Sequence, residues 1–389
     1  MDLKLTEEQE AMRKLAHDFA ENEMRPIAAE CDEKEDFPME LFPKAAKVGL
    51  TSYYLPKEYG GGGVTDPFVS CLVGEELGWG CAGITTSLTS FFLAFLPILD
   101  MGTDQQKRKH LTPFTDPDKT LLAATALTEP GAGSDTSLLS TAARREGDHY
   151  VLNGTKCFIT NGGIADLHVI FARMAGSKGL EGITAFIVEG KPRGLSMGKK
   201  ERKMGMRASH TAEVILEDVK VPVEERLGQE GGGLLGAMRM LDHSRPYVGS
   251  VALGIARAAL EVAVKYSMER VQFGGPISRQ QAIAFKLADM AMAVDAARLL
   301  IWRAAWLQGL GLPMSREGSM AKCFASDVAM RVTTEAVQVH GGYGYMKDYP
   351  LEKWMRDAKL MQIVEGTNEI QRVVISRDMF SSMKRSGVI

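Results

Sequence analysis

Hydrophobic positions along this chain change their spacing twice, from helical to strand-like and back to helical. Met12, Leu15 and Phe19 recur at intervals of three and four residues, which predicts an amphipathic helix. The preceding Thr6-Glu7-Glu8-Gln9 is the capping-box pattern that begins a helix, and Pro26 is expected to mark its end. Further helical patterns follow at 71–77 and 88–99.

Short β-prone runs replace the helical pattern in the middle of the chain. They lie at 121–126, 150–152, 156–160, 169–172, 184–188 and 212–216. Asn153-Gly154, between two of these runs, is the signal of a type I′ hairpin turn. Because no βαβ repeat is present, we expect a small sandwich or barrel and no Rossmann domain.

Helical spacing returns in the C-terminal part. It is carried by Ile283, Leu287, Met290, Val294, Ala297 and Ile301. Long helices with little strand content predict an antiparallel bundle. The expected organisation is an α+β protein of three domains, in which ligands bind at the clefts between domains. These are a helical domain at 1–120, a β domain at 121–228 and a helical bundle at 229–389.

Composition narrows the class of protein. The net charge is −3 and the pI is about 6.2, which favours neither nucleic acid nor an anionic membrane as a partner. No apolar run reaches the ~18 residues of a membrane helix, and the N-terminus has no targeting pattern. A cytoplasmic protein without a membrane span is therefore expected. The five cysteines lack Cys-x-x-Cys spacing and the seven histidines lack His-x-x-x-His, so we expect reduced thiols and no metal site.

Four segments could bind a ligand. Thr128 to Asp135 carries two glycines and two hydroxyls after a predicted strand. Such a loop can bind an anion or the polar edge of a flat ring, and the alternative is an ordinary turn. Phe158 to Gly163 would add an aromatic wall or simply end a strand. Gln338 to Gly344 fits either a helix C-cap or close approach by a phosphate. Arg270 to Gly274 suits a pyrophosphate or a surface salt bridge.

Glu365 is the candidate general base. It lies between Ile363-Val364 and Gly366, so its carboxylate should be poorly solvated. Poor solvation disfavours the charged form and raises the pKa toward neutrality, which suits a general base. The alternative is a helix cap on a surface loop, and most glutamates are exposed in this way.

Taken together, these segments resemble the acyl-CoA dehydrogenases from residue 5 to about residue 377. The resemblance implies an N-terminal helical domain, a β-barrel-like domain and a C-terminal four-helix bundle. It also implies an FAD enzyme that removes two hydrogens from an acyl-CoA thioester and passes the electrons to electron-transfer flavoprotein. Members of the family are usually homotetramers, built as dimers of dimers.

By resemblance, Glu365 takes the α-proton of the substrate. Some members carry the base at the position of Ser244 instead, and a serine cannot serve as that base. The implied flavin contacts are Leu127, Thr128, Ser134, Phe158, Thr160, Arg270, Phe273, Gln281, Gln338, Gly341, Gly342, Thr367 and Glu369. The implied acyl-CoA contacts are Ser134, Asp242, Arg245 and Gly366. In the family, Arg270 and Gln281 would reach the FAD of a neighbouring subunit.

Departures from the family pattern bear on the substrate. Phe158 stands where Trp is frequent, and Val364 replaces a Tyr that is common before the base. Phe91 and Phe92 lie on a helix that normally lines the acyl tail, which favours a short, branched or cyclic acyl group. An enoyl-CoA reductase, an acyl-CoA oxidase and a catalytically weak interaction or assembly subunit stay open as alternatives.

Overall fold

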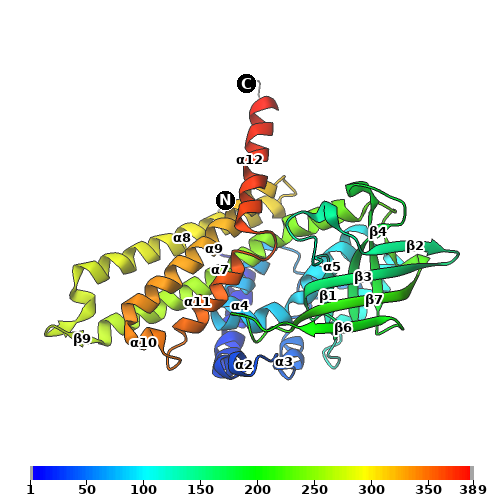
Figure 1. Ribbon diagram of the computed structural model, residues 1–389. Helices are drawn as coiled ribbons and strands as arrows, with labels where there is room; N and C mark the ends of the chain where they lie inside the picture. Colours follow the sequence, from blue (N-terminus) through cyan, green and yellow to red (C-terminus); the bar gives the residue numbers. More distant parts are fainter. Residues whose placement is uncertain (1–2, 386–389) are drawn as a thin grey trace.

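The computed structural model describes residues 3–385 and places a group of long helices beside a β-sheet (Figure 1). Met1 and Asp2, which open the N-terminal segment searched for a targeting pattern, lie outside the described residues. One continuous apolar core extends from the first helix through the sheet to the C-terminal helices. The fold therefore has the three predicted regions, helical, β and helical.

The N-terminal region is helical, as predicted. Its helices are α1 (Glu7–Phe19), α2 (Ala28–Lys34), α3 (Leu41–Lys47), α4 (Pro67–Leu88), α5 (Ser90–Met101) and α6 (Asp104–Leu111). The capping box is confirmed, because the Thr6 hydroxyl accepts from the Gln9 amide at 3.2 Å and the Gln9 side chain accepts from the Thr6 amide at 3.0 Å. The regular α-helix ends before Pro26, at Phe19, and a π-helical stretch at Ala20–Met24 continues it.

The middle region forms one mixed eight-stranded sheet in the order β6-β7-β3-β2-β4-β5-β8, with β1 beside β4. Its strands are β1 (Ala123–Ala126), β2 (Ala142–Glu146), β3 (His149–Thr160), β4 (Leu167–Met174), β5 (Ile183–Glu189), β6 (Leu195–Lys200), β7 (Thr211–Pro222) and β8 (Arg226–Leu227). The β1–β4 and β2–β4 pairs are parallel and the other pairs are antiparallel.

The predicted hairpin turn at Asn153-Gly154 is wrong. β3 runs straight through both residues and pairs with β2 on one side and β7 on the other, with an irregularity at this point. The Asn153 amide instead exchanges two hydrogen bonds of 2.9 Å with Asp218 on β7. Glycine is needed at 154 because a Cβ there would lie 2.6 Å from the Thr141 hydroxyl. The Asn-Gly pair therefore marks a close approach between strands.

The C-terminal region consists of long helices and a small hairpin. They are α7 (Gly233–Glu269), β9 (Val271–Gln272), β10 (Gly275–Pro276), α8 (Gln281–Gly309), α9 (Ser315–His340), α10 (Gly342–Tyr345), α11 (Leu351–Met361) and α12 (Asn368–Arg385). α7 packs against α4, α8 and α9, while α12 extends away from the body of the protein (Figure 1).

Length and hydropathy alone would allow α7 to cross a membrane, whereas the sequence predicted no membrane helix. The bent α4–α5 pair passes the same test. The most apolar window of α7 is 67% buried inside the fold. Its buried residues include Leu253 and Ile255, which belong to the apolar core. Burial of this kind is typical of a core helix.

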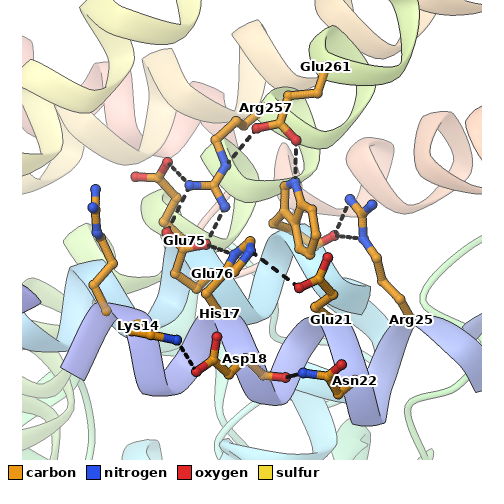
Figure 2. Close-up of polar contacts among 12 residues, drawn as sticks. Lys14, His17, Asp18, Glu21, Asn22, Arg25, Glu75, Glu76, Arg257 and Glu261 are labelled. Carbon is orange, nitrogen blue, oxygen red and sulfur yellow. Dashed lines mark hydrogen bonds and ion pairs between the residues drawn. The ribbon is translucent and has the colours of Figure 1, made fainter. Parts of the chain in front are cut away.

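A buried ionic network joins the N-terminal helices to the C-terminal ones (Figure 2). Arg257 on α7 donates to Glu75 at 3.1 Å and to both oxygens of Glu76 on α4. Arg298 on α8 binds Glu75 from the other side at 2.9 Å, and His17 on α1 lies 2.9 Å from Glu76. The guanidinium of Arg257 lowers the pKa of Glu76, although burial alone would raise it. Four helices are thus held in one arrangement.

We predict that Arg257→Met destabilises the protein by about 3 kcal/mol, because it leaves buried carboxylates without their shared cation. Thermal unfolding followed by Trp fluorescence measures this as a lower midpoint. The matched control is Lys14→Met, which removes an exposed ion pair with Asp18 within α1 and should leave the midpoint unchanged. Equal midpoints for Arg257→Met and Lys14→Met would show that the network does not hold the helices.

Candidate active site

Glu365 lies in a tight turn between α11 and α12. Its φ is 56° and that of Gly366 is 86°, so two consecutive residues have left-handed backbone. The Gln371 side chain donates to both of their carbonyl oxygens at 2.9 Å. A Cβ at position 366 would lie 2.9 Å from the Gln371 nitrogen, so the turn requires glycine there. This turn directs the Glu365 carboxylate toward α7.

Ser244 on α7 donates its hydroxyl proton to Glu365 Oε2 at 2.8 Å. The serine is fully buried. Burial raises the pKa of the Glu365 carboxyl, whereas the Ser244 hydrogen bond and the charges of Arg245 and Lys322 oppose the rise without cancelling it. The carboxylate thus has the raised pKa that its apolar neighbours in the sequence led us to expect. The residue at the position of the alternative base acts as a hydrogen-bond donor to Glu365.

Asp242 and Arg245 lie on the same helix as Ser244. Arg245 is buried and its Nη1 donates to Asp242 and, at 3.2 Å, to the Ser319 hydroxyl. Ser315 also donates to Asp242, at 2.9 Å. The Arg245 Nε, also buried, has no hydrogen-bond partner among the described residues. Asp242 and Arg245 therefore form an ion pair close to Glu365, and the Nε–H of Arg245 is free to donate to a ligand.

Lys322 on α9 was missed by the sequence reasoning. It is completely buried, and its Nζ donates to the Gly366 carbonyl at 2.9 Å and to the Asn368 side chain at 3.0 Å. Asn368 in turn donates to Ser326 at 2.9 Å and to Asp327 at 2.7 Å. The only signal in the sequence is a lysine between Ala321 and Cys323 on an apolar helix face.

A second buried lysine, also missed, fixes the loop that follows β1. Lys156 Nζ donates to the Leu127 carbonyl at 3.0 Å and to Glu129 at 2.7 Å. Glu129 also accepts the backbone amides of Ser140 at 2.7 Å and Thr141 at 3.0 Å. Burial alone would raise the pKa of Glu129, but Lys156 and these donors lower it to about 2. Leu127 and the start of the Thr128–Asp135 loop are therefore held by charge-assisted hydrogen bonds.

The end of β3 lies directly against this loop. The Cys157 amide donates to the Thr128 carbonyl at 3.0 Å. At the next residue the register of β3 on β7 shifts, and Phe158 adopts a φ of 58° with 65% of its surface exposed. Thr160 follows as a half-buried residue that pairs with Thr211. The bulge thus turns an aromatic ring out of the sheet beside Thr128.

The remaining predicted site residues lie elsewhere. Ser134 is exposed on the Thr128–Asp135 loop, while Thr367 and Glu369 adjoin Glu365 at the start of α12. A second group lies near β9 and α10, at the end of the helices opposite the sheet (Figure 1). Its members are all exposed, namely Arg270, Phe273, Gln281, Gln338, Gly341 and Gly342. Within one chain, this second group therefore lies apart from the predicted flavin residues on the sheet.

Comparison with known proteins decides the family. Models of the acyl-CoA dehydrogenase N-terminal, middle and C-terminal domains match residues 6–118, 124–219 and 231–380. The chain belongs to the acyl-CoA dehydrogenase family. It is accordingly an FAD-dependent oxidoreductase of fatty acid metabolism.

Curated acyl-CoA dehydrogenase relatives align over nearly the whole chain. A short-chain specific acyl-CoA dehydrogenase of Clostridium acetobutylicum is 48% identical over 98% of this chain and 100% of its own length. An acryloyl-CoA reductase (NADH) of Anaerotignum propionicum is 47% identical over 99% of this chain and 97% of its own. The family thus includes close relatives named for opposite directions of reaction.

Solved structures of the family are equally similar. Butyryl-CoA dehydrogenase from Megasphaera elsdenii superposes with a TM-score of 0.95 at 47% identity, covering 98% of this chain and 100% of that one. A chain from a study of the electron transferring flavoprotein of Acidaminococcus fermentans superposes with a TM-score of 0.94 at 47% identity, covering 97% and 99%. The acyl-CoA dehydrogenase fold is therefore confirmed.

The side chains of this acyl-CoA dehydrogenase fit a flavin dinucleotide. The exposed Phe158 ring supplies an aromatic surface, and positions 131 and 133 face open space in which even a Cβ would meet no atom. At the other end of the helices, Gly341 and Gly342 are equally open and Phe273 is 94% exposed. Exposed aromatic rings and open glycines are suited to close contact with a flat, phosphate-bearing ligand.

Proposed function

We propose that this protein catalyses the α,β-dehydrogenation of a short, branched or cyclic acyl-CoA to the 2-enoyl-CoA, with Glu365 removing the α-proton. The observation that carries the proposal is the half-buried Glu365 carboxylate, which has a raised pKa, accepts a hydrogen bond from Ser244 and lies on a turn of left-handed backbone. A structural helix cap would need neither a buried serine donor nor two neighbouring cations.

Proton removal is the step that the chain's own residues perform. A thioester α-proton is far less acidic than a carboxylic acid, and each pKa unit of mismatch costs about 1.36 kcal/mol. Desolvation narrows this gap by raising the pKa of Glu365. The backbone N–H of Glu365 would donate to the thioester carbonyl and stabilise the developing enolate. When bound, FAD supplies the acceptor for the β-hydrogen as hydride.

We assign the FAD contacts to two sets of residues from two subunits. The sheet set, around the flavin ring, comprises Leu127, Thr128, Ser134, Phe158, Thr160, Thr367 and Glu369. The bundle set, near β9 and α10, comprises Arg270, Phe273, Gln281, Gln338, Gly341 and Gly342. The bundle set lies at the end of the helices opposite the sheet, which supports a site completed by a neighbouring subunit (Figure 1). Asp242, Arg245, Ser134 and Gly366 would contact the acyl-CoA.

The assembly and electron partner follow from the same proposal. A composite FAD site requires at least a dimer, and the homotetramer of the family satisfies this requirement. Electron-transfer flavoprotein is proposed as the electron acceptor, supported by the similar chain from the Acidaminococcus study. A cytoplasmic location is proposed as well.

Glu365→Gln should abolish flavin reduction by an acyl-CoA, because the amide cannot accept the α-proton. The measurement is the loss of flavin absorbance near ~450 nm after anaerobic addition of butyryl-CoA. The matched control is Glu8→Gln, an exposed glutamate on α1 that belongs to no proposed site and should leave the rate unchanged. Normal bleaching by Glu365→Gln would remove the basis of the proposed function.

An aromatic cluster one helical turn from Ser244 limits the acyl group. Tyr247 lies three residues after Ser244 on α7, with its ring 5.3 Å from that of Phe92. Phe92 in turn contacts Tyr54 at 5.0 Å, and the Tyr247 hydroxyl lies 2.9 Å from that of Thr89. The space among these side chains is about 10 Å³, room for about one water molecule. A long straight chain could not extend past this cluster.

Wild-type enzyme should therefore be bleached by butyryl-, isobutyryl- or cyclohexanecarboxyl-CoA and poorly by octanoyl-CoA. Phe92→Ala should raise kcat/KM for octanoyl-CoA relative to butyryl-CoA by about tenfold, since it opens room for methylene groups worth ~0.8 kcal/mol each. Phe114→Ala, which truncates a ring packed on Phe95, is the control and should not change the preference. An unchanged preference in Phe92→Ala would show that the cluster does not set chain length.

A second candidate is an enoyl-CoA reductase, which would run the same chemistry in reverse. It is favoured by the 47% identity to the acryloyl-CoA reductase. The same anaerobic experiment separates the two. Bleaching by a saturated ester supports the dehydrogenase, whereas no bleaching together with reoxidation of the reduced flavin by an enoyl-CoA supports the reductase. A protein inert to both would be the interaction subunit.

A further inference from the structure

We propose that Lys322 is a positioning residue for the catalytic base, which holds the Glu365 turn and uses its charge to keep the Glu365 carboxylate ionised. This inference rests on the proposed role of Glu365. It adds a charged partner from α9 that no pattern around the base in the sequence suggests. Two observations carry it, the hydrogen bonds of Lys322 and the absence of a nearby carboxylate to pair with it.

The hydrogen bonds of Lys322 hold the turn in place. Left-handed backbone at a residue other than glycine costs about 1–2 kcal/mol, so the conformation of Glu365 needs support from its surroundings. That support comes from Gln371, which binds the carbonyls of residues 365 and 366, and from Lys322, which binds the Gly366 carbonyl and Asn368. Lys322 thus acts on the atoms directly beside the base.

The charge of Lys322 is unusual among the buried lysines. Three lysines are buried in residues 3–385, and two of them pair directly with a carboxylate. Lys156 binds Glu129 at 2.7 Å and Lys353 binds Asp357 at 2.6 Å. Within the same described residues, Lys322 has no carboxylate oxygen within 4.0 Å. An unpaired buried ammonium is costly, which indicates that its charge serves another group.

The charges around the site indicate that the group served by the charge of Lys322 is Glu365. From α7, Arg245 attracts the Glu365 carboxylate more strongly than Lys322 does, but Arg245 also pairs with Asp242. From α9 and α12, Asp327 and Arg372 pair at 2.8 Å. Burial lowers the pKa of Lys322 to about 8, and the strongest opposing attraction comes from Glu365.

The remaining charges on these elements do not replace Lys322. Glu369 is exposed at the start of α12, and Cys323 carries no charge because burial raises the pKa of its thiol. Removing Lys322 would therefore take away a cation that opposes the desolvation of Glu365. The pKa of Glu365 would then rise, since a nearby positive charge stabilises the carboxylate form.

The test is the pH profile of kcat/KM for the FAD-loaded enzyme with butyryl-CoA. Lys322→Met should shift the acid limb to higher pH by about one unit, a tenfold loss on the acid side that recovers as the pH rises. Lys322→Gln should shift the limb in the same direction, because it keeps an N–H donor and loses the charge. Flavin absorbance should show that both variants still bind FAD.

The matched control is Lys353→Met, which removes another buried lysine whose carboxylate partner is Asp357. It should lower the unfolding temperature without moving the acid limb. An unmoved limb in Lys322→Met, or a wild-type profile in Lys322→Gln, would overturn the inference while Glu365→Gln stays inactive. Activity in Glu365→Gln would instead refute the proposed function, so the two failures are distinguishable.

Discussion

The left-handed turn at Glu365 is the constraint on which the candidate site depends. Two consecutive residues with positive φ place the carboxylate against α7, where Ser244 donates to it at 2.8 Å. The position of α7 is in turn held by Arg257, which binds two buried glutamates on α4. An ionic network thus fixes the helix that supplies the hydrogen-bond donor to the proposed base.

Buried lysines organise the two halves of the site in the same way. Lys156 holds the Leu127 carbonyl before the loop that adjoins Phe158, and Lys322 holds the Gly366 carbonyl beside the base. In both cases an ammonium binds a backbone oxygen, so loop conformation depends on a charge buried below the loop. Their difference is the neighbouring carboxylate, since Glu129 pairs with Lys156 while the base itself is the strongest attraction on Lys322.

Local patterns predicted the features whose cause is local. The capping box at Thr6 depends on adjacent residues and appears in the structure. The raised pKa of Glu365 was also predicted, but the groups around its carboxylate are Ser244, Arg245 and Lys322, which come from α7 and α9. The turn prediction at Asn153-Gly154 was wrong because Gly154 is required by the close approach of Thr141, a residue thirteen positions away that a turn signal cannot include. Lys156 and Lys322 were missed because their partners lie 27 to 46 residues away along the chain. The arrangement of the two proposed sets of FAD contacts likewise required the fold.

The most direct test of the account is exchange of the substrate α-hydrogen. Butyryl-CoA deuterated at C2 is incubated anaerobically with the FAD-loaded enzyme in ordinary water, and loss of deuterium is followed by mass spectrometry. If Glu365 takes the α-proton, the wild-type enzyme washes out the deuterium and Glu365→Gln retains it. Washout by Glu365→Gln at the wild-type rate would contradict the assignment of Glu365 as the base.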